Sequence, residues 1–282
     1  MVTKNSERVA GFKTLSVMPK ALDTLTIKEK EARIIDTGSL VNIAKFCNTY
    51  SGKFGKGSYK SSEKESNWSG SYDWAEYKQY LKSGDPQTIS AIRETTRNNI
   101  KRIENEYKEE LVTFRPDVEG MFFDVGAVLS GEPECWFKEE VQKKQEQKIS
   151  FVLSGAFDAS FNKDNIVEAS ARILALCKVL DDNKIQTEIS IVCCNTSFDV
   201  KNKKEVLYLY SKVKSFDEPL NYVKASALLS PTYQRRLTFK VAELQADEVD
   251  SGYGYAGHPK GAISLDNMSE LKALEKKILG GK

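Results

Sequence analysis

The chain contains a single histidine, His258, among its 282 residues. Catalysis by Ser-His-Asp or Cys-His groups, and zinc, copper or iron sites built from several imidazoles, therefore have only this one side chain available. His258 also lies in the glycine-rich stretch GYGYAGHPKG, where a solvated imidazole is the expected state. Carboxylate or hydroxyl chemistry stays open, but we expect a protein that is not an enzyme and that carries no cofactor.

Cysteines are few, and their spacing fits neither of their usual structural roles. They are odd in number, widely spread and without a CxxC pair, which argues against a disulfide framework and against a zinc ribbon. Reduced and mostly buried thiols are the expected state. The five cysteines are Cys47, Cys135, Cys177, Cys193 and Cys194.

Long apolar runs are also missing. No segment approaches the roughly 18 apolar residues of a membrane span, and the first fifteen residues lack the apolar core of a secretory signal. We therefore expect a protein of the cytoplasm with no membrane partner. The net charge is only +2, so any contact with nucleic acid has to come from a local basic patch.

The middle of the chain alternates strands and helices. Residues 149–154 form an apolar run typical of a strand covered on both faces, residues 164–184 have helical spacing, and residues 185–195 are again apolar. This is the pattern of a βαβ unit, which residues 203–214 extend by a third strand. Two helices opened by Pro219 and Pro231 follow. Residues 118–246 therefore predict an α/β sandwich with a mainly parallel central sheet flanked by helices.

Two further regions complete the predicted organisation. Residues 1–117 are expected to be a helical region, in which residues 26–47 hint at a helix and Asp73 caps a short helix that Gly84 ends. Asp85 followed by Pro86 then begins a long, one-sided helix over 86–112. Residues 247–282 are expected to form a glycine-rich tail with a short C-terminal helix. Whether residues 1–117 fold independently stays open.

Several segments resemble a family of phage and plasmid proteins with a degenerate von Willebrand factor A-like domain. The most distinctive are GEPEC, from Gly131 to Cys135, and the stretch from Pro231 through Arg235 and Arg236 to Phe239. The resemblance implies a von Willebrand A-like, Rossmann-like sandwich. By analogy of biological setting, and without a matching motif, the chain also resembles the single-stranded-DNA-binding proteins with which Enquatrovirus-type podoviruses recruit their own RNA polymerase.

A magnesium site is the first candidate, because the resemblance implies a metal-binding Asp-x-Ser-x-Ser loop after the first central strand. Ser154, Ala156 and Asp158 stand where that pattern has Asp, Ser and Ser, so all three ligands are changed. We therefore expect no metal here, and a loop that packs the start of the next helix. A rearranged site to which Asp158 and Ser160 contribute oxygens is the alternative.

A nucleic-acid interface is the second candidate. In the loop over 48–68, lysines that can follow a phosphate backbone alternate with aromatic rings on which unpaired bases can stack. A basic stripe four residues apart continues on one face of the long helix. A solvated loop and an ordinary polar helix are the alternatives. The predicted contacts are Tyr50, Lys53, Phe54, Lys56, Tyr59, Lys60, Trp68, Arg93, Arg97 and Lys101.

Arg235 and Arg236 lie on a helix with apolar neighbours, so at least one of them is expected near the core. A buried guanidinium needs a carboxylate or carbonyl partner, which Asp124, Glu134 or Glu243 could provide, and a structural ion pair is favoured over phosphate binding.

Together these features predict a phage-type single-stranded DNA-binding protein that acts in transcription or replication and recruits a phage RNA polymerase or another protein. A von Willebrand A-like protein adaptor without nucleic-acid binding is the alternative, and self-association stays open. The third and weakest hypothesis is an enzyme with carboxylate chemistry around Asp158.

Overall fold

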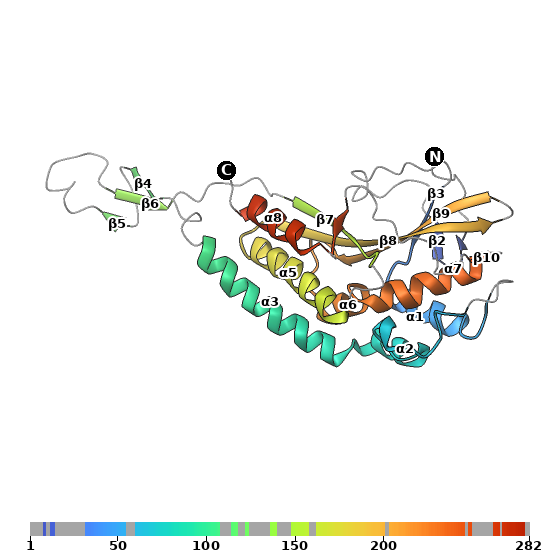
Figure 1. Ribbon diagram of the computed structural model, residues 1–282. Helices are drawn as coiled ribbons and strands as arrows, with labels where there is room; N and C mark the ends of the chain where they lie inside the picture. The colour runs from blue at the N-terminus through green and yellow to red at the C-terminus, as the bar shows by residue number, and fades with distance from the viewer. Residues whose placement is uncertain are drawn as a thin grey trace.

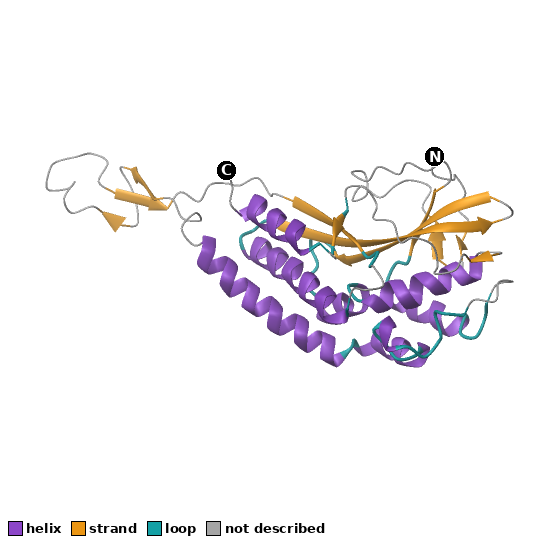
Figure 2. Cartoon of the chain, viewed as in Figure 1, coloured by secondary structure: helices purple, strands orange, loops and turns teal. Residues whose placement is uncertain are grey.

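The computed structural model describes most of the chain, and its centre is a sheet with helices packed on one face (Figures 1 and 2). The described residues are 8–9, 12–14, 32–54, 60–107, 114–117, 122–123, 136–139, 148–157, 162–200, 203–245, 248–249, 262–265 and 267–279.

Five strands form the body of the sheet, in the order β3, β9, β8, β7, β11. The pairs β3–β9, β8–β7 and β7–β11 are parallel, whereas β8 and β9 form a long antiparallel hairpin. The sheet is therefore mostly parallel, as predicted, but its central pair is antiparallel. The strands are β3 (Ala32–Asp36), β7 (Lys148–Ser154), β8 (Gln186–Val200), β9 (Lys203–Lys214) and β11 (Ile263–Ser264).

Shorter strands extend this sheet and form a second one. β1 and β2 add an antiparallel edge beside β3, and β10 pairs with β8. A separate three-stranded sheet has the order β4, β6, β5. These strands are β1 (Arg8–Val9), β2 (Phe12–Thr14), β4 (Phe114–Asp117), β5 (Phe122–Phe123), β6 (Trp136–Glu139) and β10 (Glu248–Val249).

The βαβ unit is confirmed. β7 leads into α5 (Lys163–Asp182), which returns to β8 in parallel register with Leu153 beside Ile191. Both side chains are buried in the core beneath the helices.

The remaining helices lie on the same face of the sheet as α5 (Figure 2). They are α1 (Leu40–Thr49), the short η2 (Asn67–Ser69), α2 (Trp74–Ser83), α3 (Pro86–Tyr107), α6 (Tyr222–Leu228), the π-helical turn η4 (Tyr233–Thr238), α7 (Phe239–Gln245) and α8 (Met268–Leu279).

The predicted helix boundaries at residues 73–86 are confirmed. The side chain of Asp73 accepts a hydrogen bond of 2.7 Å from the Glu76 amide, which caps α2. Gly84 ends that helix with φ 75°, and a Cβ atom there would lie 2.3 Å from Cδ1 of Ile89. Only glycine fits both the backbone angle and the space.

Two predictions about local structure are wrong. Residues 32–36 of the hinted N-terminal helix form strand β3, because Ile34 and Ile35 are both buried within the sheet, and the helix begins only at Leu40. The helix expected at Pro219 begins at Tyr222, because Asn221 supplies the capping side chain for the Lys224 amide.

One hydrophobic core joins the three predicted regions. Phe46 and Trp74 from the N-terminal region, Leu153 from the middle and Leu271 from the tail belong to the same buried cluster. The predicted boundaries at 117/118 and 246/247 therefore do not separate independent cores. Among the described residues, no helix is both long and apolar enough to cross a bilayer.

Asp85 links the start of α3 to α5. It accepts hydrogen bonds from the Gln87 amide at 3.1 Å, from the Thr88 hydroxyl and from Lys163 Nζ at 2.5 Å. Burial alone would raise the pKa of this carboxyl, but the hydrogen bonds from Lys163 and Thr88 hold it below its ordinary value. Its contribution to stability is thus present at neutral pH and lost as the pH falls through the lowered pKa.

We predict that Asp85→Asn lowers the free energy of unfolding at pH 7 by about 1 kcal/mol, because the amide keeps the cap but loses the ion pair. As the pH falls through the lowered pKa of Asp85 the two proteins should converge, since the wild-type carboxyl then becomes protonated. Urea unfolding across this pH range measures both quantities. Asp182→Asn is the control, because its pair with Lys178 is exposed; an equal loss there would refute the role of burial.

Candidate nucleic-acid interface

Arg236 is the fully buried centre of the region that holds the predicted loop. Its guanidinium has five N–H donors in one plane, and they point into the chain that wraps around it. The acceptors are the carbonyl oxygens of Ser62 (2.8 Å), Lys64 (2.7 Å), Ser66 (3.4 Å), Ser71 (2.6 Å) and Tyr72 (2.8 Å), and Oγ of Ser71 (3.2 Å).

The partners of Arg236 are thus of the carbonyl kind, and the favoured ion pair with Glu243 is not formed by this guanidinium. Backbone carbonyls satisfy the guanidinium, and Glu243 instead accepts from the amide (2.8 Å) and the hydroxyl of Ser62. Burial lowers the pKa of Arg236 from its ordinary value, yet an arginine stays charged at any physiological pH. Asp124 and Glu134 lie outside the described residues.

Lys240 holds the same loop from the next turn of the helix. It is fully buried, and its Nζ donates to Glu63 at 2.6 Å and lies 3.6 Å from the centre of the Phe54 ring. Glu63 in turn accepts from the amide of Gly52 at 2.9 Å. Residues 52–54 and 60–72 are thus tied to η4 and α7 by buried charges, rather than extending freely into solvent.

Arg236, Lys240 and Glu243 together form what we name the clamp. Trp68 is a large aromatic residue on the segment that the clamp holds, and it is exposed to solvent. Its side chain is 42% exposed, while the Arg235 guanidinium lies 3.9 Å from the ring centre. Arg235 also donates from Nη1 to the Trp68 carbonyl at 2.5 Å, and the Phe239 ring stacks at 6.2 Å. Arg235 itself is only 2% exposed. The indole ring is therefore fixed in place with part of its surface open.

The other predicted loop residues divide into two groups. Lys53 and Lys60 are exposed, with their Nζ atoms 5.9 Å and 5.3 Å from the rings of Tyr50 and Phe54. Tyr50 and Phe54 are half-buried, and Tyr50 packs against Phe46 at 5.0 Å. These two rings are therefore partly packed against the protein, and only part of each is open to a ligand. Lys56 and Tyr59 lie outside the described residues.

The predicted basic stripe lies along α3. Arg93, Arg97 and Lys101 are all exposed, and the Arg93 guanidinium lies 5.2 Å from the Tyr222 ring of α6. Figure 1 shows α3 leading away from α2 along the helical layer, so the stripe and the loop occupy different parts of that layer.

Three residues of this region are absent from the sequence-based prediction of contacts. Tyr72 is 49% exposed and its hydroxyl donates to Glu65 at 2.6 Å. Arg235 and Lys240 support Trp68 and Phe54 from more than 150 positions along the chain. The alternation of lysines and aromatics, extended by four residues, would have included Tyr72, whereas no local pattern identifies the other two.

The changed metal loop packs against its neighbours. Ser154 is fully buried, its Oγ accepts from the Ala156 amide at 3.4 Å, and the Phe157 amide donates to Gln234 at 2.9 Å. A Cβ atom on Gly155 would lie 2.5 Å from Sγ of Cys193, so close packing explains the small residue. Asp158 lies outside the described residues, which contain no cluster of three His, Cys, Asp or Glu suited to a metal.

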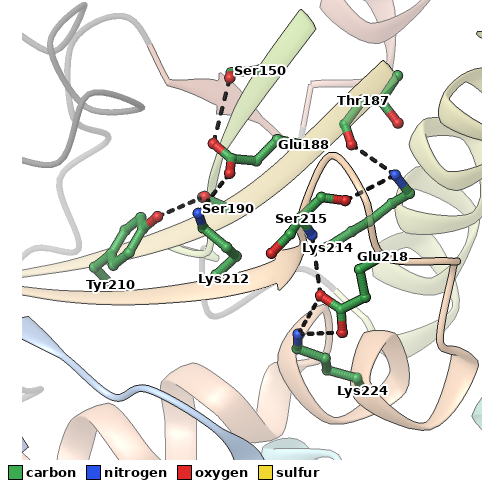
Figure 3. Close-up of polar contacts among 10 residues, drawn as sticks. All are labelled: Ser150, Thr187, Glu188, Ser190, Tyr210, Lys212, Lys214, Ser215, Glu218 and Lys224. Carbon is green, nitrogen blue, oxygen red and sulfur yellow. Dashed lines mark hydrogen bonds and ion pairs between the residues drawn. The ribbon is translucent and has the colours of Figure 1, made fainter. Parts of the chain in front are cut away.

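A polar network crosses the strands of the sheet (Figure 3). Lys212 donates to Glu188 at 2.6 Å, Ser150 donates to the same carboxylate at 3.5 Å, and Ser190 shares a hydrogen bond of 3.0 Å with Tyr210. Burial raises the pKa of Tyr210, and the pKa of Lys212 is raised by Glu188 in spite of burial. Each side chain is paired on a neighbouring strand, so this network stabilises β7, β8 and β9.

We predict that Arg236→Lys lowers the free energy of unfolding by about 3 kcal/mol, because one ammonium group cannot replace a planar donor that serves several carbonyls. Arg97→Lys, an exposed change of the same type, should alter it by less than about 0.5 kcal/mol. Chemical denaturation measures both. Equal stability of Arg236→Lys and the wild type would show that the clamp does not hold the loop.

Comparison with known proteins gives one match. The model of the Domain of unknown function (DUF7192) matches residues 28–279, which covers β3 through α8. No curated protein and no solved structure matches the chain. Because the match spans most of the sequence, the chain belongs to the DUF7192 family.

Proposed function

We propose that this chain binds single-stranded DNA through the exposed side chains of Lys53, Lys60, Trp68 and Tyr72, which we name the Trp68 surface. The observation that supports this most is the indole ring of Trp68, 42% exposed and backed by the Arg235 guanidinium at 3.9 Å. An aromatic ring held in place in this way is ready for stacking, which is worth about 1–3 kcal/mol per base.

The surroundings of Trp68 favour a nucleic-acid strand over a purely apolar partner. Lys53, Lys60 and Lys64 are exposed, and the carbonyls of Ser62 to Tyr72 converge on one guanidinium, so Lys64 and both exposed rings belong to one small region. Lysines contact phosphates whatever the sequence. Stacking requires an open base face, which a duplex does not offer, so the preferred ligand is single-stranded.

The basic stripe of α3 extends the proposal to longer strands. Arg93, Arg97 and Lys101 are exposed on one side of the helix and would contact phosphates beyond the Trp68 surface. We expect Arg97→Ala combined with Lys101→Ala to weaken binding of a long oligothymidylate and to leave a short one unaffected. Equal weakening of both lengths would contradict a stripe that acts only beyond the loop.

The wider biological role belongs to the same proposal. Binding of single strands fits a phage-type protein that acts in transcription or replication and recruits a polymerase, in the cytoplasm of a host cell. There the buried thiols of Cys47, Cys177 and Cys193 would stay reduced. The von Willebrand A-like identity rests on the sequence resemblance and on the β7–α5–β8 unit.

The test is fluorescence anisotropy with a labelled oligothymidylate of about 20 nucleotides. Trp68→Ala should weaken binding about tenfold, because one base can no longer stack on the indole ring. Replacing Lys53 and Lys60 by alanine should lower the salt dependence of log K by about 0.7 for each phosphate that the protein no longer neutralises.

Val41→Ala is the matched control, because Val41 is a 75% exposed apolar side chain without a ring. It should leave DNA affinity unchanged. A wild-type protein that binds no single strand at low salt would overturn the proposal and leave the protein adaptor as the better hypothesis.

A further inference from the structure

Glu65 borders the Trp68 surface, and its carboxylate is only partly used by the protein. The side chain is exposed, its Oε2 accepts from the Tyr72 hydroxyl at 2.6 Å, and among the described residues nothing donates to its Oε1. Glu63 and Glu76, by contrast, each use both carboxylate oxygens within the protein. A carboxylate repels the phosphates of a bound strand, so Glu65 lowers the affinity for DNA unless the ligand offers it a donor.

The chain around Tyr72 holds this carboxylate at the outer edge of the phenol ring. The Ser66 amide donates to the Tyr72 carbonyl at 2.7 Å, Arg236 donates to the same carbonyl at 2.8 Å, and Glu76 accepts from the Tyr72 amide. The Tyr72 backbone is therefore fixed on both sides. The hydrogen bond to Glu65 raises the pKa of Tyr72, so the phenol stays a donor at neutral pH.

A base that stacks on Tyr72 can direct its Watson–Crick edge at the Glu65 carboxylate. Tyr72 is 49% exposed, and aromatic rings of this kind stack with unpaired bases. Because the carboxylate lies beyond the hydroxyl, it is within reach of the outer edge of a base placed over the ring. The sugar is attached on the opposite side of the base, so the phosphates need not approach Glu65.

Only one of the four bases suits a carboxylate at that edge. Guanine has two adjacent N–H donors there, at N1 and N2, which match the two oxygens of one carboxylate in a bidentate, charge-assisted pair. Adenine and cytosine have a ring-nitrogen acceptor beside the amino group, and thymine has a carbonyl on each side of its single N–H. A carboxylate carries acceptors only, about four lone-pair sites in all, so Oε2 can accept from guanine as well as from Tyr72.

We propose that Tyr72 and Glu65 form a guanine-selective subsite of the Trp68 surface, in which the base stacks on the phenol ring and the carboxylate accepts from N1–H and N2–H. This inference rests on the proposed binding of single-stranded DNA and adds a preference for one base to it. Lysine contacts are independent of sequence, and stacking alone is tolerant of it. Glu65 is therefore the specificity-determining residue of the surface.

Displacement of a labelled oligothymidylate of about 20 nucleotides by unlabelled strands of about five nucleotides tests the subsite, because a short strand has few registers. The competitors carry thymine at every position except the central one. We expect central guanine to compete about fivefold better than central adenine, a purine that stacks without the paired donors. Hypoxanthine, which keeps N1–H and lacks the 2-amino group, should lie between them.

Glu65→Gln should move the preference from guanine to adenine. The glutamine amide has a donor beside an acceptor, which match N1 and the N6 amino group of adenine and leave one guanine donor facing another donor. The labelled oligothymidylate should bind this variant at least as well as the wild type, because a negative charge near the phosphates is removed. A retained guanine preference in this variant would refute the role of Glu65.

Glu168→Gln is the matched control, since Glu168 is an exposed carboxylate on α5, away from the Trp68 surface. It should keep the guanine preference. Equal competition by all short strands, or no competition at millimolar concentration, would overturn the subsite while the bound oligothymidylate leaves the proposed function standing. Failure of the oligothymidylate itself to bind at low salt would overturn both.

Discussion

The hydrogen bonds of the buried Arg236 guanidinium hold the segment from Ser62 to Tyr72 against η4, and the Trp68 surface depends on them. The guanidinium satisfies five backbone carbonyls between Ser62 and Tyr72, in a stretch of chain that has little regular structure of its own. Backbone groups buried without partners are costly, so this segment needs a donor from elsewhere in the chain. Arg236 provides it, and with Lys240 and Glu243 it converts a loop into a fixed surface on α7.

Elements governed by local chemistry could be predicted from the sequence. The Asp73 cap, the Gly84 stop and the Asp85-Pro86 start all act within a few residues, and the structure has each of them. The apolar run around Leu153 likewise predicted a central strand. Residues 32–36 were harder, because their short apolar run becomes a strand only through pairing with β9, far along the chain.

The sequence predicted the loop that carries the candidate site, but not which of its side chains are exposed. Alternating lysines and aromatics pointed to the loop, but which rings are exposed depends on what packs beneath them. Lys240 covers Phe54 and Arg235 supports Trp68, and both contacts join residues distant in sequence. The partners of Arg236 are carbonyls, which every residue has, so no composition or spacing could identify them.

The π-helical turn over Tyr233–Thr238 sets the direction of everything that follows it. Such a turn holds one residue more than an α-helix would for the same hydrogen-bonded ring. Loss of a single residue there would restore ordinary helix and rotate Phe239, Lys240 and Glu243 by about 100° around the axis. A change of length in this turn would therefore displace all three side chains at once, whereas a substitution changes the contacts of one residue.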